Sequence, residues 1–223
     1  MNCGATDGIT YLPLAEHSFV GDICTGCGIA KIELTTIKSD GTNNALITQE
    51  NGLYSYTFAS DGDYVRNDCI TLEKGDTLVC DWTMTLDVIA ESGWFGVAFG
   101  DGTDVTKYPN TMFGMRYYSH DSIKYKDSVD VKDYDASKTI YDMLNVNGQA
   151  TNYRVTLTYN EDGTYSYRFM RTDNDGNYSV VDEYLNIDCP SPTSLYLLTA
   201  YNPTESTHLN NFTMTDLSFY KLG

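Results

Sequence analysis

The chain has 223 residues, with 31 acidic and 14 basic side chains, so its formal net charge is −17. A charge of this sign and size repels polyanions, which argues against nucleic acid and anionic membrane surfaces as partners. No run approaches the roughly 20 apolar residues that a membrane-spanning helix needs, so we expect no membrane insertion. The length fits one all-β domain with a small appendage.

The first thirty residues combine few strand signals with four candidate metal ligands, Cys3, His17, Cys24 and Cys27. The last two form a CxxCG knuckle, in which both thiolates can reach one small cation. Zn²⁺ prefers four nitrogen or sulfur ligands in a tetrahedron, and the spacing C-x13-H-x6-C-x2-C supplies them. The pattern predicts a structural zinc site. A Cys24–Cys27 disulfide, or loose thiols beside an exposed His17, are the alternatives.

From Ala30 onward the sequence alternates between strands and turns. The clearest strand runs from Thr77 to Val88, where apolar and polar residues alternate with period two. Its apolar face carries Trp82, which we expect in the core, and Trp94 begins a nearly all-apolar strand that we also expect there. The clearest hairpin joins Tyr153–Tyr159 to Thr164–Phe169 through an Asp-Gly turn.

The other expected strands are Ala30–Ile37, Tyr54–Phe58, Cys69–Leu72, Trp94–Phe99, Met112–Tyr118, Tyr178–Tyr184, Ser194–Ala200 and Phe212–Tyr220. No segment has the pattern of a long amphipathic helix. Residues 119–148 are acidic and poorly patterned, and they are long for a loop, which is typical of functional or disordered segments. Short strands with regular turn signals predict an all-β sandwich or barrel.

The segments Thr71–Leu78, Gly93–Gly100, Tyr153–Phe169 and Asn211–Tyr220 resemble, in strand order and spacing, the concanavalin A-like, laminin-G-like jelly roll. The resemblance implies a two-sheet jelly-roll sandwich over residues 31–223. This fold hosts lectins, carbohydrate-binding modules, glycanases and adhesion domains, so it points to a fold more strongly than to a function.

The segment from His17 to Gly28 resembles a short zinc-ribbon-like CxxCG motif of large surface proteins of Gram-positive bacteria, and Cys3-Gly4-Ala5 resembles the end of a preceding copy. The resemblance implies a small ribbon-like segment over residues 1–30. It also implies an extracellular or cell-wall-attached setting and a monomeric module of a longer chain. The chain begins directly before Cys3 without a leader, and we expect the complete protein to be longer.

Aromatic and acidic residues are dense between residues 101 and 142. Sugar sites pair an aromatic ring with carboxylates or amides that bind the hydroxyl groups. The candidate carbohydrate-binding residues are Tyr108, Tyr117, Tyr118, Tyr125, Asp101, Asp104 and His120. The alternative is that these tyrosines cover strand faces, as most strand tyrosines do.

Calcium is a second candidate ion, because Asp101–Asp104 and Asp173–Gly176 cluster oxygen ligands. Turns rich in Asp are more often only turns. The cysteines outside the first segment are Cys69, Cys80 and Cys189. We expect them to be buried thiols, with a Cys69–Cys80 disulfide as the alternative.

The paired carboxylates that glycanases of this fold carry on one strand are missing, and no serine-hydrolase, zinc-protease or phosphate-loop motif occurs. We therefore expect no enzyme. The sequence favours a non-catalytic, lectin-like module that binds a glycan or polysaccharide. The alternatives are a protein-adhesion or spacer domain without a small ligand, and a glycanase with unfamiliar catalytic residues.

Overall fold

The structure is a computed structural model of the chain. It describes residues 19–20, 23–26, 28–32, 46–50, 53–57, 63–66, 70–85, 94–101, 111–116, 123–127, 130–133, 144–145, 147–173, 175–188, 194–202 and 213–223. Within these ranges it contains strands and no helix, which confirms the all-β prediction. No helix in the described part of the chain has the length and apolarity to cross a membrane.

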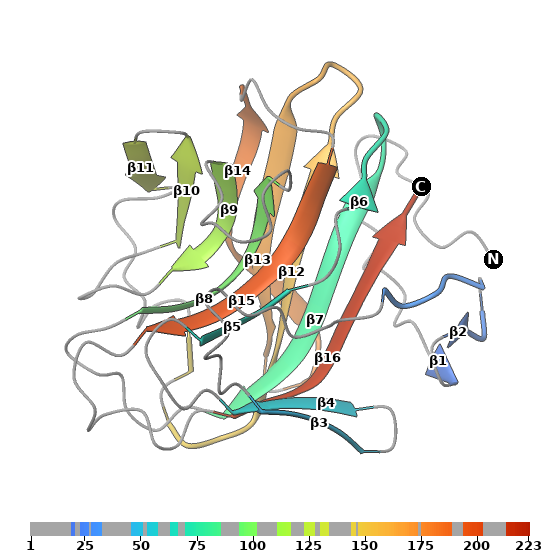
Figure 1. The fold of residues 1–223 in the computed structure, drawn as a ribbon, viewed down its shortest axis with the longest axis vertical. Coiled ribbons are helices and arrows are strands. Elements are labelled where there is room, and N and C mark those ends of the chain that lie inside the picture. Colours follow the sequence, from blue (N-terminus) through green and yellow to red (C-terminus); the bar gives the residue numbers. More distant parts are fainter. Residues whose placement is uncertain are drawn as a thin grey trace.

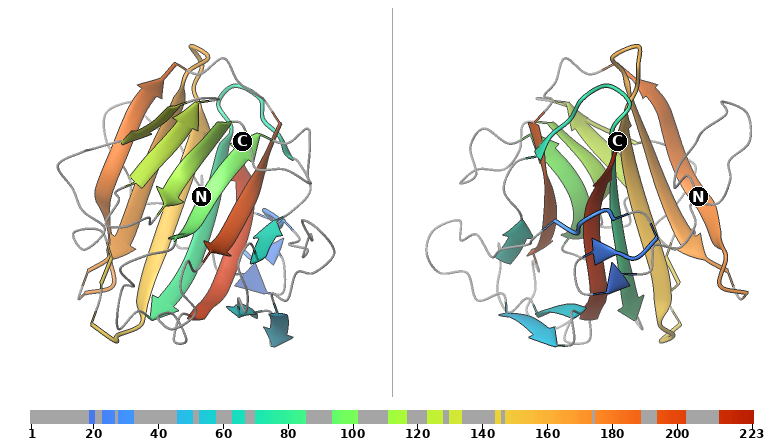
Figure 2. Two further views of the ribbon diagram at one scale, coloured as in Figure 1. Left: turned by 60° about the vertical axis from the view of Figure 1, so that its left-hand side comes forward. Right: turned by 90° about the vertical axis from the view of Figure 1, so that its right-hand side faces the viewer.

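Two antiparallel sheets pack face to face and make the sandwich (Figure 1). The first, which we call the β12 sheet, has the spatial order β14 (Tyr178–Ile187), β13 (Tyr165–Thr172), β12 (Thr151–Tyr159), β7 (Thr77–Thr85), β16 (Thr213–Leu222), β4 (Leu53–Thr57) and β3 (Leu46–Glu50). The second, the β8 sheet, has the order β11 (Asp130–Asp133), β10 (Ile123–Asp127), β9 (Thr111–Arg116), β8 (Trp94–Asp101), β15 (Ser194–Asn202) and β5 (Asp63–Arg66). β6 (Ile70–Thr71) also pairs with β15. Figure 2 shows the two layers from the side.

The described N-terminal residues, including β1 (Phe19–Val20) and β2 (Ile23–Cys24), lie beside this sandwich (Figure 1). These two strands form a separate two-stranded hairpin. A few residues later, Lys31 bridges to Tyr220, and the amide of Ile32 donates to the carbonyl of Phe219 at 2.6 Å. The chain thus enters the body beside β16.

The long strands agree with the sequence patterns, and the short edge strands do not. Every segment that we expected as a strand after residue 50 overlaps an observed strand. The region 119–148, which we expected to lack strands, contains β10 and β11 at the edge of the β8 sheet. The reason is that these strands have only five and four residues, most of them charged, so the alternation of Ile123 and Tyr125 with lysines is too short to be recognised as a half-buried strand.

The core lies between the inner faces of the two sheets. Trp82 is 1% exposed, and its ring lies 5.6 Å from Tyr153 and 6.1 Å from Phe169, which confirms the prediction that it is a core residue. Phe99 of the β8 sheet contacts Phe219 of the β12 sheet with their ring centroids 6.1 Å apart. The side chain of Trp94 lies outside the described residues.

Cys80 occupies the same inner face as a free, fully buried thiol. Burial, and secondarily the charge of Asp81, raises the pKa of the Cys80 thiol well above its usual value. The thiol therefore stays protonated and packs as a small apolar group, as predicted. The Cys69–Cys80 disulfide is not formed, while Cys69 itself and Cys189 lie outside the described residues.

Candidate functional site

The site that we describe lies on the outer face of the β12 sheet. Successive side chains of a strand point to opposite faces. Because Cys80 and its partner Phe219 point toward the β8 sheet, their neighbours Asp81 and Tyr220 point away from it. Arg154 lies directly opposite Asp81 on the adjacent strand β12 and shares this outer face.

Asp81 is the centre of a hydrogen-bonded cluster. The guanidinium of Arg154 donates from Nε to Oδ1 and from Nη2 to Oδ2, the latter at 2.9 Å. The hydroxyl of Tyr220 donates to Oδ2 at 3.1 Å. The side chain of Arg154 is 5% exposed and that of Asp81 is 20% exposed. The ion pair is therefore mostly buried, and its carboxylate is the member nearer to solvent.

The charge of Asp81 and the burial of its partners determine the protonation states of Arg154 and Tyr220. Burial lowers the pKa of Arg154, but the hydrogen bond and charge of Asp81 outweigh it, so the pKa lies above its usual value. Burial, followed by the charge of Asp81, raises the pKa of Tyr220. At neutral pH, Arg154 is therefore a cation, and Tyr220 keeps the proton that it donates to Asp81.

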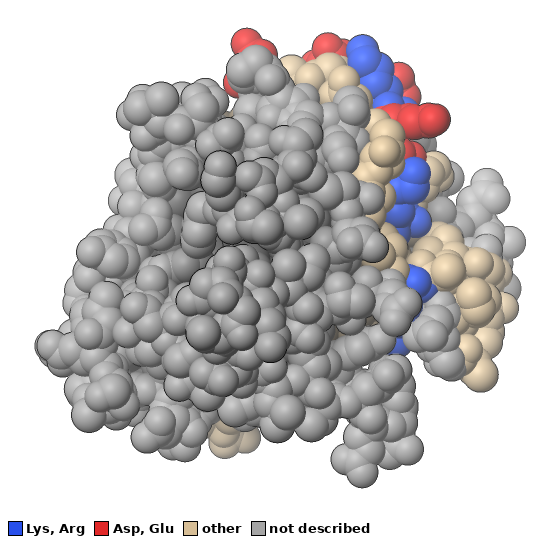
Figure 3. Space-filling model, viewed as in Figure 1, with Lys and Arg blue, Asp and Glu red and all other residues tan. Residues whose placement is uncertain are grey.

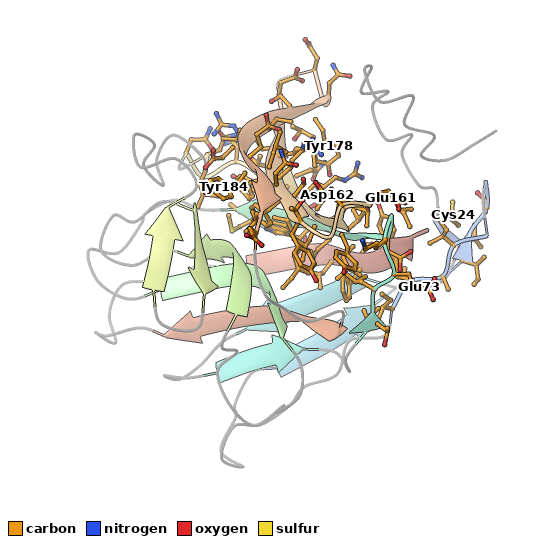
Figure 4. The ribbon with its side chains drawn as sticks, turned by 90° about the horizontal axis from the view of Figure 1, so that it is seen from above. Cys24, Glu73, Glu161, Asp162, Tyr178 and Tyr184 are labelled. Atoms are coloured by element: carbon orange, nitrogen blue, oxygen red, sulfur yellow. The ribbon has the colours of Figure 1, made fainter. Side chains whose placement is uncertain are left out.

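Tyr178 completes the site from the edge strand β14. Its ring lies over the guanidinium of Arg154, with 4.4 Å between Cζ and the ring centroid, as in a cation–π contact. Figure 4 shows Tyr178 on the side of β14 away from the β8 sheet. The register of the sheet thus brings residues of β7, β12 and β14 together from distant parts of the chain.

An open hollow of about 250 Å³ lies at this cluster, lined by Asp81, Trp82, Thr83, Asn152 and Tyr178. Thr83 donates from Oγ1 to Oδ1 of Asn152 at 2.8 Å, which orients the amide so that its NH₂ group remains a donor. The hollow therefore combines an aromatic ring, a carboxylate and an amide. Its volume is below the roughly 300–1,000 Å³ that is usual for pockets that hold drug-sized ligands.

Two further ion pairs lie on or beside the described part of the β12 sheet, outside the lining of the hollow. Arg168 donates to Glu183 at 3.0 Å on the same sheet face. Lys221 donates to Asp76 at 2.9 Å at the end of the sheet. Figure 3 views the molecule from the side of the β8 sheet and shows described basic and acidic side chains next to one another along one side of the molecule. The described lining of the hollow itself contains one charged residue, Asp81, which is paired with Arg154.

The structure does not test the carbohydrate-binding residues expected from the sequence. Tyr108, Tyr117, Tyr118, Asp104 and His120 lie outside the described residues. Asp101 ends β8 and Tyr125 lies in β10, but only their backbones are described. These residues remain predictions, and the hollow on the β12 sheet is a separate site that sequence reasoning did not find. The one signal for it was the opposite charge of Asp81 and Arg154 in the middle of two strands.

The described part of the knuckle has the backbone of a tight turn. Cys24 is 3% exposed, and its carbonyl accepts a hydrogen bond from the amide of Gly28 at 2.9 Å. Gly28 has a φ of 76°, a left-handed conformation that glycine adopts without strain. The other three predicted ligands, Cys3, His17 and Cys27, lie outside the described residues, so the zinc site stays a prediction.

The Asp173–Gly176 segment, a candidate for calcium, forms a turn in which Asp173 is already engaged. Its Oδ1 accepts hydrogen bonds from the amides of Asp175 and Asn177, both at 2.9 Å. No cluster of three or more His, Cys, Asp or Glu side chains suited to a metal occurs among the described residues. The side chains of the Asp101–Asp104 segment are not among those that the structure describes.

Comparisons with known proteins find likeness in structure but not in sequence. No family model matches the chain, and no curated protein matches it by sequence. The alginate lyase vAL-1 of a Chlorella virus is 9% identical, with a TM-score of 0.51 over 86% of this chain and 92% of that chain. The endo-β-1,4-glucuronan lyase of Trichoderma reesei is 9% identical, with a TM-score of 0.47 over 86% and 95%. Peanut lectin is 11% identical, with a TM-score of 0.47 over 85% and 95%.

The likeness to the alginate lyase overturns the prediction that the chain is not an enzyme. That prediction depended on missing catalytic motifs, whereas a polysaccharide lyase has the same fold at a TM-score of 0.51. The missing motifs therefore do not exclude catalysis. At 9% identity this likeness shows the fold alone. Together with the two antiparallel sheets, it shows that the chain is an all-β, concanavalin A-like jelly-roll sandwich.

Proposed function

We propose that the chain binds carbohydrate at the hollow on the outer face of the β12 sheet. The observation that carries the proposal is the convergence of Tyr178, Asp81 and Asn152 around one open hollow. A sugar presents C–H groups to an aromatic ring and hydroxyl groups to carboxylates and amides. Tyr178 would stack against the sugar ring, while Asp81 accepts hydrogen bonds from its hydroxyl groups and Asn152 donates to its oxygens.

The name of one structural neighbour gives this proposal context. The alginate lyase, with a TM-score of 0.51, acts on a polysaccharide by its name. A small open site immobilises a hydrated ligand with few contacts, so we expect modest affinity. The setting that we propose, from the ribbon resemblance, is a secreted or cell-surface bacterial protein.

Replacing Tyr178 with alanine is expected to lower glycan affinity about tenfold or more, which corresponds to about 1.4 kcal/mol. Tyr178→Phe keeps the ring and should retain most of the affinity. The measurement is isothermal titration with oligosaccharides that the wild-type chain selects from a broad glycan array. Leu185→Ala is the matched control, because Leu185 is 42% exposed on the same strand and does not line the hollow.

Absence of binding across the array, or equal affinity of wild type and Tyr178→Ala, would contradict the proposed site. The same incubations are assayed for new reducing ends and for unsaturated products. Their release would show that the site cleaves the polysaccharide, as the fold of the alginate lyase allows, and their dependence on Tyr178 would place cleavage at the hollow.

We further propose that the first segment holds a structural zinc ion through Cys24, Cys27, His17 and Cys3. The buried Cys24 and the positive φ of Gly28 suit such a knuckle. We expect about one zinc per chain by elemental analysis. Cys24→Ser should reduce the zinc content sharply, whereas Cys80→Ser, in the core of the body, should not. A chain purified without zinc, or unchanged content in Cys24→Ser, would contradict this proposal.

A further inference from the structure

The cation beside the hollow is paired with Asp81 and does not line the hollow itself. Arg154 directs Nε and Nη2 to Asp81, and its plane is covered by the ring of Tyr178. Only 5% of its side chain is exposed. Arg154 is not among the residues that line the hollow, so a ligand carboxylate bound there would meet Asp81 before the N–H groups of Arg154 that are not directed to Asp81.

The charged group that does line the hollow is the carboxylate of Asp81. Its Oδ2 already accepts two hydrogen bonds, from Arg154 and from Tyr220, whereas Oδ1 accepts one from Arg154. A carboxylate oxygen has two acceptor sites, so Oδ1 can accept one more donor. A sugar hydroxyl can supply that donor. An ionised uronate group cannot, and it would meet a like charge.

The net charge of the whole chain also disfavours a uronate ligand. The net charge of −17 repels an acidic polysaccharide at long range. Among the described residues that line the hollow, the only charged one is Asp81, so no basic side chain there offers a partner to a uronate. The hollow is thus a neutral site that presents one acceptor oxygen, within an acidic protein.

Resting on the proposed function, we propose that the hollow selects an uncharged sugar unit over a uronate, and that Asp81 sets this selectivity. Asp81 does so in two ways: it engages the guanidinium of Arg154, and it presents Oδ1 to a hydroxyl group. The alginate lyase, which shares the fold, is named for a uronate polymer. The ligand class of this chain would therefore differ from that of its structural neighbour.

The test compares neutral gluco-, manno- and xylo-oligosaccharides with oligogalacturonate and oligoglucuronate by isothermal titration. The wild-type chain is expected to bind its best neutral ligand about tenfold or more tightly than either uronate. Asp81→Asn keeps an acceptor oxygen for Arg154 but leaves the cation uncompensated. It should weaken neutral binding about tenfold and increase uronate binding, and this gain should disappear at high salt.

Two further variants, together with checks of folding, distinguish an effect of charge on binding from an effect of misfolding. Asp81→Asn combined with Arg154→Gln removes both charges, so it should lose the gain in uronate binding. Glu183→Gln removes a carboxylate from the same sheet face outside the hollow, and both affinities should stay unchanged. Circular dichroism and thermal unfolding check that each variant is folded.

The possible results distinguish a failure of the selectivity from a failure of the proposed binding site. A wild-type chain that binds uronates as tightly as neutral sugars, in a manner that depends on Tyr178, would overturn the selectivity and leave the proposed site standing. Unchanged selectivity in a folded Asp81→Asn variant would likewise overturn the role of Asp81. A chain that binds none of the probes would overturn the proposed function, and the selectivity with it.

Discussion

Replacing Trp82 with alanine is expected to lower the free energy of unfolding by about 3–5 kcal/mol. The indole is 1% exposed and stacks on Tyr153, with Phe169 beside it, on the inner face of the β12 sheet. Its removal leaves a cavity that rigid neighbouring strands cannot fill. Urea unfolding followed by far-ultraviolet circular dichroism measures the loss.

Trp82→Phe is the matched control. It keeps an aromatic ring against Tyr153 and removes the indole N–H, which has no hydrogen-bond partner among the described residues. A buried donor without a partner is unfavourable by about 1–3 kcal/mol, so removing it offsets part of the lost packing. We expect Trp82→Phe to lose less than half as much stability as Trp82→Ala. Equal losses, or an alanine variant as stable as wild type, would contradict this account of the core.

Replacing Asp81 with alanine is expected to lower the free energy of unfolding by about 3–5 kcal/mol, because it leaves a buried guanidinium without its counter-ion. Arg154→Met should lower it by only about 1–2 kcal/mol, since the carboxylate that remains is partly solvated and keeps a hydrogen bond from Tyr220. The asymmetry follows from the exposed fractions of the two side chains, 5% for Arg154 and 20% for Asp81.

The double variant Asp81→Leu/Arg154→Met tests whether the loss of stability comes from one buried charge left without its partner rather than from the loss of the ion pair itself. Replacing both charges with apolar groups should restore stability to within about 1 kcal/mol of wild type. Denaturant midpoints of the three variants at neutral pH provide the measurement. If Asp81→Ala is no more destabilising than Arg154→Met, Arg154 is better solvated than the structure indicates.

The sequence patterns predicted the body of the sandwich well. In β7 the alternation of Leu78, Cys80, Trp82 and Met84 with polar residues matches the buried inner face that the structure has. Periodicity can be recognised from neighbouring residues alone. It is clear in β7 because this strand is long and has one buried face. The strands β10 and β11 escaped prediction because they are short and mostly charged, so they offer too few residues for such a period to be recognised.

The hollow could not be predicted in the same way. Asp81 and Arg154 are 73 positions apart and meet only because β7 and β12 are neighbours in a particular register. Tyr178 reaches Arg154 from β14, across the intervening strand β13. A sequence shows which residues lie on strands, but the order of the strands in the sheet depends on long-range packing. The sequence analysis therefore favoured the dense tyrosines of residues 101–142, where the signal is local.

The central claim, that carbohydrate binds at the hollow on the β12 sheet, is tested most directly by a crystal structure of the chain with the oligosaccharide that binds it most tightly. The claim predicts a sugar ring packed within about 4.5 Å of the ring of Tyr178 and a sugar hydroxyl that donates to Oδ1 of Asp81. A sugar bound beside residues 101–120 or on the β8 sheet, with only solvent in the hollow, would contradict it.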